Sequence, residues 1–332
     1  MICLGIESTA HTLGIAVVEH TGESDYEGWT FRSNVRKAFT SPDAGMVPAK
    51  VSDHHSAAAQ GAISEALAKA GVTMDDIDLV AFSQGPGIGQ CLRIGAALAR
   101  SLSLRYQKPL VGVNHCVAHL EIGRITSGLA DPVLLYASGA NTQVIAFDNG
   151  TYRVFGETLD TGVGNFLDQL ARELGLGFPG GPEIEKLAKN GEYYPLPYTV
   201  KGMDVAFAGL LTRLKKDIAD KKKHEDLCCA AQETAFAMLC EVAERALAHT
   251  GKAELVLGGG VACNARLQEM CRIMCEQRGA KSFAPERQFL VDNAAMIAAT
   301  GIVMHKKGVT TTIEKSQIEP HERTDAVLVT WR

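Results

Sequence analysis

No apolar run in the 332 residues is long enough to cross a lipid bilayer, which takes about 20 predominantly apolar residues in a helix. The first residues, MICLGIE, carry neither a basic segment nor a small-residue cleavage site, so the sequence predicts no secretory signal. These two absences argue against a membrane protein and against a secreted one. We therefore expect a soluble protein of the cytoplasm that has no membrane partner.

The sequence also lacks the paired cysteine spacing of a zinc ribbon or a redox motif. Its nine cysteines are scattered, and no two of them stand in a C-x-x-C arrangement. Cys228 and Cys229 are adjacent, and Cys271 and Cys275 are four residues apart. We expect buried, reduced thiols, as is usual in cytoplasmic proteins.

The sequence has fewer positive than negative side chains. It contains 33 lysines and arginines and 38 aspartates and glutamates, which gives a formal net charge of −5. Proteins that bind nucleic acid over their whole surface are usually basic, so that class is disfavoured. The most basic stretch contains Lys215, Lys216, Lys221, Lys222 and Lys223, and taken alone it reads as a solvated helix and loop. Contact with RNA would need such a local patch or a partner that supplies positive charge.

Two similar strand–turn–strand units stand out in the apolar pattern. Residues 2–6 and 13–18 flank one short polar turn, and residues 133–137 and 143–147 flank another. The chain is too long for one small core and suits two domains. We interpret the two units as a weak internal duplication, with one copy opening each half of the chain.

Between these units, helical and strand patterns alternate. The sequence predicts a helix over 54–70, a buried strand over 77–83, a glycine-rich turn over 84–89, a helix over 92–104 and a strand over 110–113. The second half continues in the same way. Such alternation is typical of an α/β protein.

Two histidines, His115 and His119, stand four residues apart on a predicted helix, so they lie on one face and can share a metal ion. Spacing alone fits two unrelated, partly buried histidines equally well. In the H-E-x-x-H motif of zinc peptidases a glutamate general base follows the first histidine, whereas Cys116 stands here. A metal site needs further ligands, and Asp292 and Tyr136 are candidates at the ends of other elements.

Three glycine-rich loops, at 85–89, 180–181 and 258–260, adjoin predicted strands or helices. Backbone N–H groups in such turns and at helix N-termini can bind phosphate. None of the three matches the Walker motif or the full dinucleotide fingerprint, and any one of them alone reads as a turn. Three in one chain, together with two hairpin turns rich in serine and threonine, favour a nucleotide site.

Several polar residues near these loops have plausible roles in nucleotide binding. Ser138 and Asn141, on the second hairpin turn, can reach phosphate. Asp168 and Glu185 can accept hydrogen bonds from ribose hydroxyls. Asn264 can either cap a helix or contact adenine or ribose, and periodicity does not choose between these roles.

Six segments occur in the order that one known family shows: Glu7 to Thr12, Asn114 to His119, Tyr136 to Gln143, Gly164 to Asp168, Phe178 to Pro182 and Gly258 to Asn264. They resemble the universal family that forms threonylcarbamoyladenosine (t6A) in tRNA, and the resemblance covers essentially the whole chain. His11 is similar to the archaeal and eukaryotic branch, the catalytic subunit of the KEOPS complex, because the bacterial branch has an acidic residue there.

The resemblance implies an actin-like ATPase fold, with two α/β domains related by duplication and a nucleotide in the cleft between them. We expect one domain at residues 1–128 with about 295–332, and the other at 129–294. The resemblance also implies a metal ion, iron first and zinc second, bound by His115, His119 and Asp292 with Tyr136 close by. Contacts to the ATP, AMP or threonylcarbamoyl-AMP ligand are expected from a wider set: Tyr136, Ala137, Ser138, Gly139, Ala140, Asn141, Asp168, Gly181, Glu185 and Asn264.

The activity that the resemblance implies is transfer of threonylcarbamoyl from threonylcarbamoyl-AMP to N6 of the adenosine beside the anticodon, in tRNAs that read ANN codons, with release of AMP. It implies tRNA as substrate and KEOPS partners, namely a small dimerising subunit and a small atypical kinase, which some archaeal relatives carry fused. In the transfer, Glu7 or His11 would orient the phosphate or accept the proton, and the sequence leaves that choice open.

Two positions depart from the family's usual pattern. Ala140 replaces the second glycine of the hairpin turn, and its methyl group narrows the approach of a ligand to the backbone. Ser8 replaces a glycine common in this branch. The metal-ligand positions and Asn264 are intact.

Three other functions compete with the transferase hypothesis. A zinc endopeptidase, an old interpretation of this family, is disfavoured by the absent glutamate at position 116. A sugar kinase or plain ATPase of the same fold would need a catalytic carboxylate near the γ-phosphate but no histidine pair. A nucleic-acid-binding protein without catalysis is disfavoured by the acidic net charge.

Overall fold

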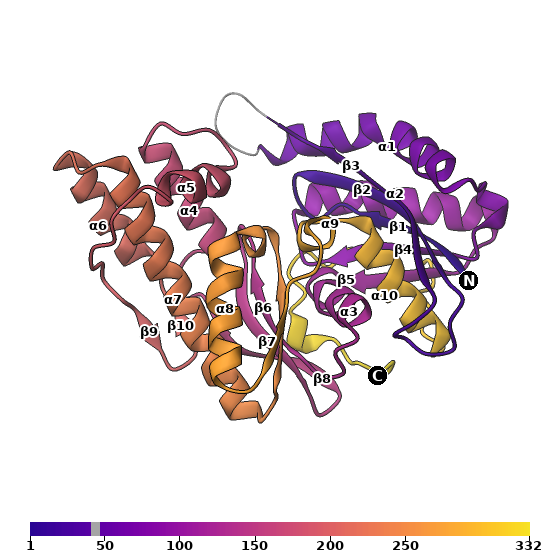
Figure 1. Ribbon diagram of the computed structural model, residues 1–332. Helices are drawn as coiled ribbons and strands as arrows, with labels where there is room; N and C mark the ends of the chain where they lie inside the picture. The colour runs from indigo at the N-terminus through magenta and orange to yellow at the C-terminus, as the bar shows by residue number, and fades with distance from the viewer. Residues whose placement is uncertain (41–46) are drawn as a thin grey trace. The chain divides into compact units, whose positions relative to one another are not determined.

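The computed structural model describes residues 1–40 and 47–332, which divide into two compact units. The first contains residues 1–128, 148–152 and 292–332, and the second contains 129–147 and 153–291. Each is an α/β unit built on one five-stranded sheet. The α/β class expected from the alternating pattern is confirmed (Figure 1).

The first unit has a sheet of strand order β3-β2-β1-β4-β5, with β1 antiparallel to β2 and parallel to β4. Its strands are β1 (Ile2–Glu7), β2 (Thr12–His20), β3 (Trp29–Ala38), β4 (Leu79–Gly85) and β5 (Leu110–Asn114). Its helices are α1 (Pro48–Ala70), α2 (Gly89–Tyr106), α3 (His115–Ser127) and α10 (Ala294–Lys306), with short 3₁₀ turns at Met74–Asp76 and Thr324–Ala326.

Alternation along β1 explains how helices cover both faces of this sheet. Leu4 and Ile6 point into a core that includes alanines of α1 and α2. Gly5, between them, faces α10 so closely that a Cβ there would lie 2.8 Å from the backbone nitrogen of Ala298. Because successive strand residues point to opposite faces, α10 packs on the face opposite α1 and α2 (Figure 1). Helix α3 packs beside α10.

The second unit has a sheet of order β12-β11-β6-β7-β8. Its strands are β6 (Val133–Ala137), β7 (Thr142–Asp148), β8 (Thr151–Glu157), β11 (Glu254–Gly258) and β12 (Lys281–Phe283), with a small ribbon of β9 (Val200–Lys201) and β10 (Asp204–Val205). Its helices are α4 (Val163–Glu173), α5 (Gly180–Ala188), α6 (Ala208–Ala219), α7 (His224–Thr250), α8 (Ala265–Gln277) and α9 (Arg287–Leu290), with a 3₁₀ turn, η2, at Gly260–Cys263.

The two sheets repeat one topology. In each, an antiparallel three-strand meander is followed by two parallel strands, so β1, β2, β3, β4 and β5 correspond to β6, β7, β8, β11 and β12. The internal duplication inferred from the hairpins is confirmed by this shared order.

Some sequence-based boundaries were wrong, since the helices expected over 54–70 and 92–104 span Pro48–Ala70 and Gly89–Tyr106. Near the C-terminus, Leu328 forms a β-bridge to Thr151. This bridge, and the buried contact of Tyr152 with Glu121, are consistent with the place of residues 148–152 in the first unit. Strands β3 and β8 were missed because polar residues interrupt their apolar pattern.

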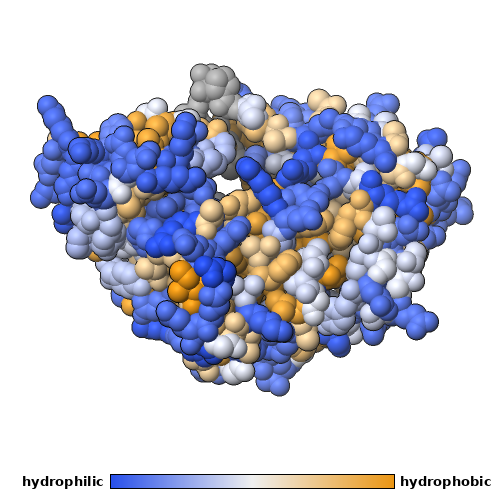
Figure 2. Space-filling model, viewed as in Figure 1, coloured by the Kyte–Doolittle hydropathy of each residue, from blue (hydrophilic) through white to orange (hydrophobic). Residues whose placement is uncertain are grey.

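Among the described residues, none of the helices is both long and apolar enough to cross a bilayer. On the face shown in Figure 2, hydrophilic residues predominate and hydrophobic ones form small groups between them.

Candidate metal centre and nucleotide loops

His115 and His119 lie on the first turns of α3, which continues directly from β5. Asn114 caps the helix, since its side chain accepts a hydrogen bond from the N–H of Val117 at 3.1 Å. The predicted helical spacing is therefore realised. The two imidazole rings stand edge to face, 4.9 Å apart at their centres, and both are buried.

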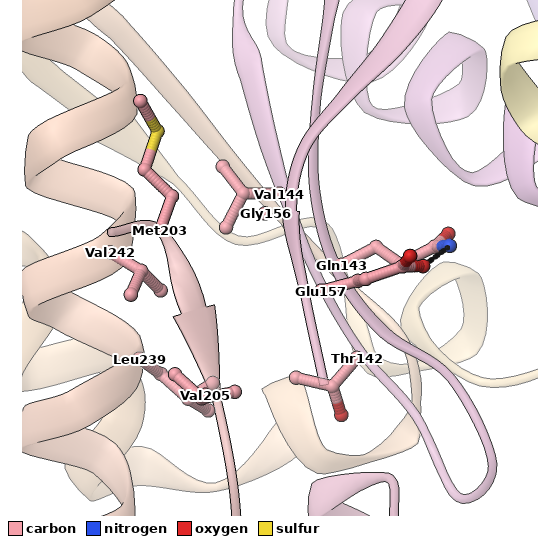
Figure 3. A pocket seen from close by; sticks show the side chains of 9 residues that line it. All are labelled: Thr142, Gln143, Val144, Gly156, Glu157, Met203, Val205, Leu239 and Val242. Atoms are coloured by element: carbon pink, nitrogen blue, oxygen red, sulfur yellow. Dashed lines mark hydrogen bonds between the residues drawn. The ribbon is translucent and has the colours of Figure 1, made fainter. Parts of the chain in front are cut away.

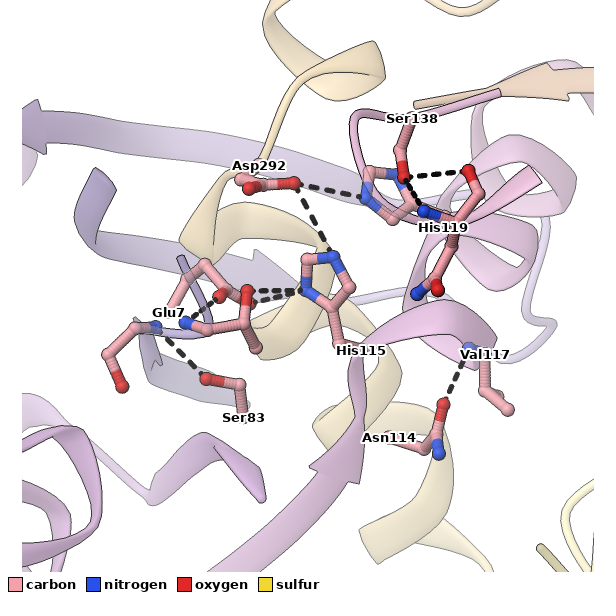
Figure 4. A network of polar contacts seen from close by, with 11 residues as sticks. Glu7, Ser83, Asn114, His115, Val117, His119, Ser138 and Asp292 are labelled. Atoms are coloured by element: carbon pink, nitrogen blue, oxygen red, sulfur yellow. Dashed lines mark hydrogen bonds and ion pairs between the residues drawn. The ribbon is translucent and has the colours of Figure 1, made fainter. Parts of the chain in front are cut away.

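Asp292, which precedes the N-cap of α10, completes a group of three metal-binding side chains (Figure 4). Its Oδ1 lies 3.4 Å from Nε2 of His115 and 3.7 Å from Nε2 of His119. Metal bonds of about 2.0–2.2 Å place two ligands of one ion roughly 3–3.5 Å apart, so these separations fit a shared ion. Two imidazoles and one carboxylate form a donor set suited to iron or zinc.

The protonation states of this group also suit a cation. Burial lowers the pKa of His119, and the nearby Asp292 only partly opposes this. Burial of Asp292 favours its protonated form, but hydrogen bonds and charge from both histidines outweigh that effect and hold its pKa well below the usual range. A neutral imidazole and an ionised carboxylate are the forms that bind metal.

The carboxylate of Glu7, at the end of β1, touches this group from the other side of His115. Oε2 of Glu7 lies 2.9 Å from Nδ1 of His115, and Oε1 accepts a hydrogen bond from the N–H of Thr9 at 2.6 Å (Figure 4). The Thr9 hydroxyl lies 3.3 Å from the same Nδ1. His11, in the same turn and half-buried, lies near enough to His55 to affect the pKa of that ring.

Cys116, the residue that follows the first histidine, is buried, and burial raises the pKa of its thiol. It has no carboxylate, so it does not supply the glutamate general base of a zinc peptidase. This supports the argument from sequence against an endopeptidase.

The expected nucleotide-binding residues belong to the second unit, where Tyr136 and Ala137 end β6 and are buried. The turn that follows is closed by Ser138, whose N–H and hydroxyl both donate to the carbonyl of Asn141 at 2.9 Å. Gly139 and Ala140 at its tip are exposed. The tip of the turn is thus exposed to solvent, while hydrogen bonds between Ser138 and Asn141 hold its two ends together.

This turn packs against the N-terminus of α4. The N–H of Gly164 donates to the carbonyl of Ser138 at 3.0 Å, and that of Asn165 donates to Gly139 at 2.9 Å. A Cβ on Gly164 would lie 2.7 Å from the Cα of Gly139, so only glycine allows this approach. Gly259 has a φ of 90° and also lies against the backbone of this turn.

In the second unit, three polar side chains accept hydrogen bonds from backbone N–H groups at the starts of helices α5 and α8. Asp168 on α4 accepts from the N–H of Gly180 at 2.7 Å, and Glu185 on α5 accepts from the N–H of Ala265 at 3.0 Å. Asn264 caps α8, accepting from Arg266 N–H at 2.9 Å. The structure thus brings Asp168, Glu185 and Asn264 together with the glycine-rich turns, and Gly181 follows at the start of α5 with open space where a Cβ would stand.

The first glycine-rich loop serves packing. A Cβ on Gly87 would lie 2.7 Å from the carbonyl oxygen of Thr9, and the N–H of Gly87 donates to the carbonyl of Pro320 at 3.1 Å. The chain itself therefore covers this loop, and it does not offer the phosphate cradle that its sequence allowed.

A small depression in the second unit is also filled by packing. It is lined mainly by apolar side chains, among them Val144, Met203 and Val242, between β7, β10 and α7 (Figure 3). It has no interior volume that admits a water molecule.

Comparison with solved structures supports the fold. The chain superimposes on full-length HypF in the phosphate- and nucleotide-bound form with a TM-score of 0.62, at 12% identity over 92% of this chain and 46% of that one. It superimposes on the activator of 2-hydroxyisocaproyl-CoA dehydratase from Clostridium difficile with a TM-score of 0.55, at 12% identity over 92% and 96%. At this identity the likeness shows the fold alone, and it is the expected actin-like ATPase fold.

Comparison with protein families is more specific. The family model described as tRNA N6-adenosine threonylcarbamoyltransferase matches residues 32–299. The protein of that name from Thermococcus kodakarensis is 53% identical over the full length of both chains. The chain belongs to this family. It is also 52% identical to a probable bifunctional tRNA threonylcarbamoyladenosine biosynthesis protein of Methanosarcina acetivorans, over 99% of this chain and 59% of that protein.

Membership of this transferase family confirms the resemblance read from the six ordered segments. Sequence reasoning named the histidine pair and Asp292, but it missed the parts of the site that support them. Thr9 touches His115, and His55 holds the carbonyl of Ala10, yet neither was singled out. Their contacts join positions far apart in the chain, for which spacing gives no signal.

Proposed function

We propose that this chain transfers a threonylcarbamoyl group from threonylcarbamoyl-AMP to N6 of the adenosine beside the anticodon, in tRNAs that read ANN codons. The observation that carries the proposal is the group of two buried histidines, His115 and His119, with the half-buried Asp292 in a member of the threonylcarbamoyltransferase family. The new bond joins N6 to the carbamoyl carbon, the bond from that carbon to the phosphate oxygen breaks, N6 loses a proton and AMP leaves.

His115, His119 and Asp292 would hold one metal ion, iron first and zinc as the alternative, and Tyr136 is the further candidate ligand. When bound, such an ion supplies Lewis acidity that polarises a carbonyl or phosphate oxygen of the donor. The buried imidazoles and the low pKa of Asp292 prepare the protein for that charge.

The second unit would bind the adenylate. Hydroxyl and backbone groups of Ser138, Gly139 and Asn141 would meet the phosphate, because this turn is exposed at Gly139 and half-buried at Ser138 and Asn141. The carboxylates of Asp168 and Glu185, which lie at the N-termini of α5 and α8, would accept hydrogen bonds from ribose hydroxyls. Positioning supplies much of the rate, because the mixed anhydride already has a good leaving group.

The remaining contacts expected of the adenylate come from Tyr136, Ala137, Ala140, Gly181 and Asn264. In the first unit, His11 is the candidate to orient the phosphate or accept the proton. The lysines near residue 221 lie partly in ion pairs, such as Lys222 with Asp217 at 3.3 Å. We therefore infer that tight binding of tRNA needs partner subunits, namely the small dimerising subunit and the atypical kinase of a KEOPS complex.

The test is incorporation of labelled threonine into unmodified tRNA. The mixture contains ATP, bicarbonate, an adenylate-forming enzyme and candidate KEOPS subunits, with and without this chain. We expect label in the tRNA only when this chain is present. Absence of label beside a homologue that works with the same partners would contradict the proposal and favour a nucleotide-hydrolysing regulator of the same fold.

A further inference from the structure

We propose that Glu7 is a positioning residue whose carboxylate fixes the tautomer and orientation of His115. The inference rests on the proposed metal site and deepens it. Glu7 is completely buried, and its Oε2 lies 2.9 Å from Nδ1 of His115 although 108 residues separate the two in sequence (Figure 4). No sequence spacing predicts this pairing.

The contact decides which ring nitrogen of His115 is free to bind a cation. In the proposed arrangement Nδ1 of His115 carries a proton and donates it to the carboxylate oxygen of Glu7. Nε2 then keeps its lone pair, and it is Nε2 that lies 3.4 Å from Oδ1 of Asp292. Histidines that bind metals commonly donate their other ring N–H to a carboxylate in this way, which orients the ring and raises its basicity.

The turn that carries Glu7 is held in place by contacts of its own. The N–H of Ser8 donates to Oγ of Ser83 at 3.0 Å. Nε2 of His55 lies 3.0 Å from the carbonyl oxygen of Ala10 and donates to it. Because strand β1 precedes the carboxylate and these contacts anchor the turn that follows it, the orientation of His115 is set before any ion binds.

The same contacts argue against Glu7 as the proton acceptor in the transfer. A general base must reach the proton that it takes, directly or through one water molecule. Both oxygens of Glu7 are engaged, one by the N–H of Thr9 at 2.6 Å and the other by His115, and the side chain has no exposed surface. Of the two residues left open by the sequence, His11 is therefore the remaining candidate for that role.

The test is the metal affinity of the full chain carrying Glu7→Gln, measured by competition for Zn²⁺ with a chromogenic chelator. Glutamine has one acceptor oxygen and one NH₂, so it cannot accept from both Thr9 and His115 at separate oxygens. We expect affinity to fall by about 10- to 100-fold, the usual effect of losing such a supporting carboxylate.

The matched control is Glu121→Gln, which also removes a completely buried carboxylate from the first unit. Glu121 accepts from Nε1 of Trp331 at 3.0 Å and from the phenol of Tyr152, and it touches none of the proposed ligands. We expect its zinc affinity to stay within about twofold of the unsubstituted chain. Equal losses in both variants would overturn the inference in favour of general destabilisation.

Other outcomes are equally decisive. Unchanged zinc affinity in Glu7→Gln overturns the role of Glu7 and leaves the metal site standing. Failure of the unsubstituted chain to bind any zinc, iron or cobalt defeats the metal site itself, and the inference with it. The two failures are thus distinguishable.

A measurement on the unsubstituted protein keeps the inference testable if Glu7→Gln does not fold. Long-range ¹H–¹⁵N correlation spectra of the zinc-loaded chain report the protonation of each imidazole nitrogen. We expect the proton of His115 on Nδ1 and the metal on Nε2. The opposite tautomer would refute a positioning role for Glu7.

Discussion

In the first unit the strand before the opening hairpin turn ends in Glu7, whereas the equivalent strand of the second unit ends in Ala137. The first turn is locked to a histidine by a buried carboxylate, and the second is closed by its own serine and asparagine. One duplicated scaffold therefore carries a group of side chains that could hold a cation in one copy and a turn without charged side chains in the other. The shared backbone topology determines where each turn lies. The side chains of each turn determine the charge of the ligand that the turn can bind.

The largest expected effect is on the metal content of the protein, which should depend on the first unit and not on the turn of the second. Replacing His115 and His119 together by alanine removes two of three proposed ligands, so we expect bound metal to fall from about one ion per chain to a trace. Transfer should fall roughly a thousandfold, since a Lewis acid supplies several kcal/mol of transition-state stabilisation. Elemental analysis and the labelled-threonine assay measure the two effects.

Asn141→Ala in the second unit is the matched control for this pair. It alters the neutral turn, so metal content should be unchanged while the KM for the adenylate rises. The comparison breaks if the metal-free double variant transfers at the full rate, or if Asn141→Ala loses the metal.

A second, smaller effect tests how the neutral turn is held. In Gly164→Ala the new Cβ would lie 2.7 Å from the Cα of Gly139 and 2.8 Å from the carbonyl oxygen of Ser138. Both obstacles are backbone atoms, so the turn must move, and we expect a loss of about 1–3 kcal/mol in the free energy of unfolding. Nucleotide affinity should fall with it, while metal content stays constant. Denaturant unfolding and nucleotide titration are the measurements.

The control for Gly164→Ala is Gly209→Ala on α6 of the same unit. No heavy atom outside the neighbouring backbone lies within 4 Å of a Cβ there. Alanine in an exposed helix stabilises by up to about 1 kcal/mol relative to glycine. A Gly164→Ala protein as stable as this control would show that the turn is not held by close packing.

The sequence predicted the elements of these turns better than their contacts. Local periodicity placed β6 within its observed bounds and put His115 and His119 on one helical face, because both patterns depend on near neighbours. Asp292 was named as one of two candidate further ligands at the ends of other elements, and the resemblance then implied it as a ligand, since no spacing links it to the histidine pair. Other contacts form only when the chain folds, such as the pairing of Glu7 with His115 and the packing of Gly87 against Thr9. They join residues far apart in the sequence, so the spacing of residues in a single sequence does not predict them.

A third prediction concerns a glycine of the first unit that packs against a side chain, whereas Gly164 packs against backbone. In the first unit, a Cβ on Gly95 would overlap the hydroxyl of Ser8, the residue that replaces a glycine common in this branch. We expect Gly95→Ala to cost about 1–2 kcal/mol of unfolding free energy. The double variant Ser8→Gly/Gly95→Ala should recover at least half of that loss, because the obstacle is a side chain that can be removed.

No second substitution of this kind can restore the stability of Gly164→Ala in the second unit, because the atoms that its Cβ would meet belong to the backbone. A double-mutant cycle on unfolding free energies measures the coupling between Ser8 and Gly95. Additive losses would mean that the two positions do not share space, and the contrast between the turns would then lose this support.

The smallest expected effect concerns pH and the first unit. His20 on β2 is buried, its Nδ1 accepts from Nζ of Lys306 at 2.8 Å, and its Nε2 donates to the carbonyl of Ser24 at 3.1 Å. Burial and then the charge of Lys306 lower the pKa of His20, and Asp25 opposes them weakly. The folded state therefore binds a proton less readily than the unfolded state. The stabilising contribution is complete above the unfolded pKa of about 6.5 and declines as pH falls below it.

Comparing the unsubstituted protein with His20→Gln isolates this contribution, because glutamine can accept from Lys306 and donate to Ser24 without titrating. We expect the unsubstituted protein to lose more unfolding free energy than His20→Gln between pH 7.5 and pH 5.5, both measured by denaturant titration. His55 and His119 also have lowered pKa values, so both proteins should lose some stability in acid, and only the difference reports His20. Identical pH profiles would show that the Lys306 contact does not disfavour protonation of this ring, and acid sensitivity of the first unit would then rest on the histidines around its charged turn.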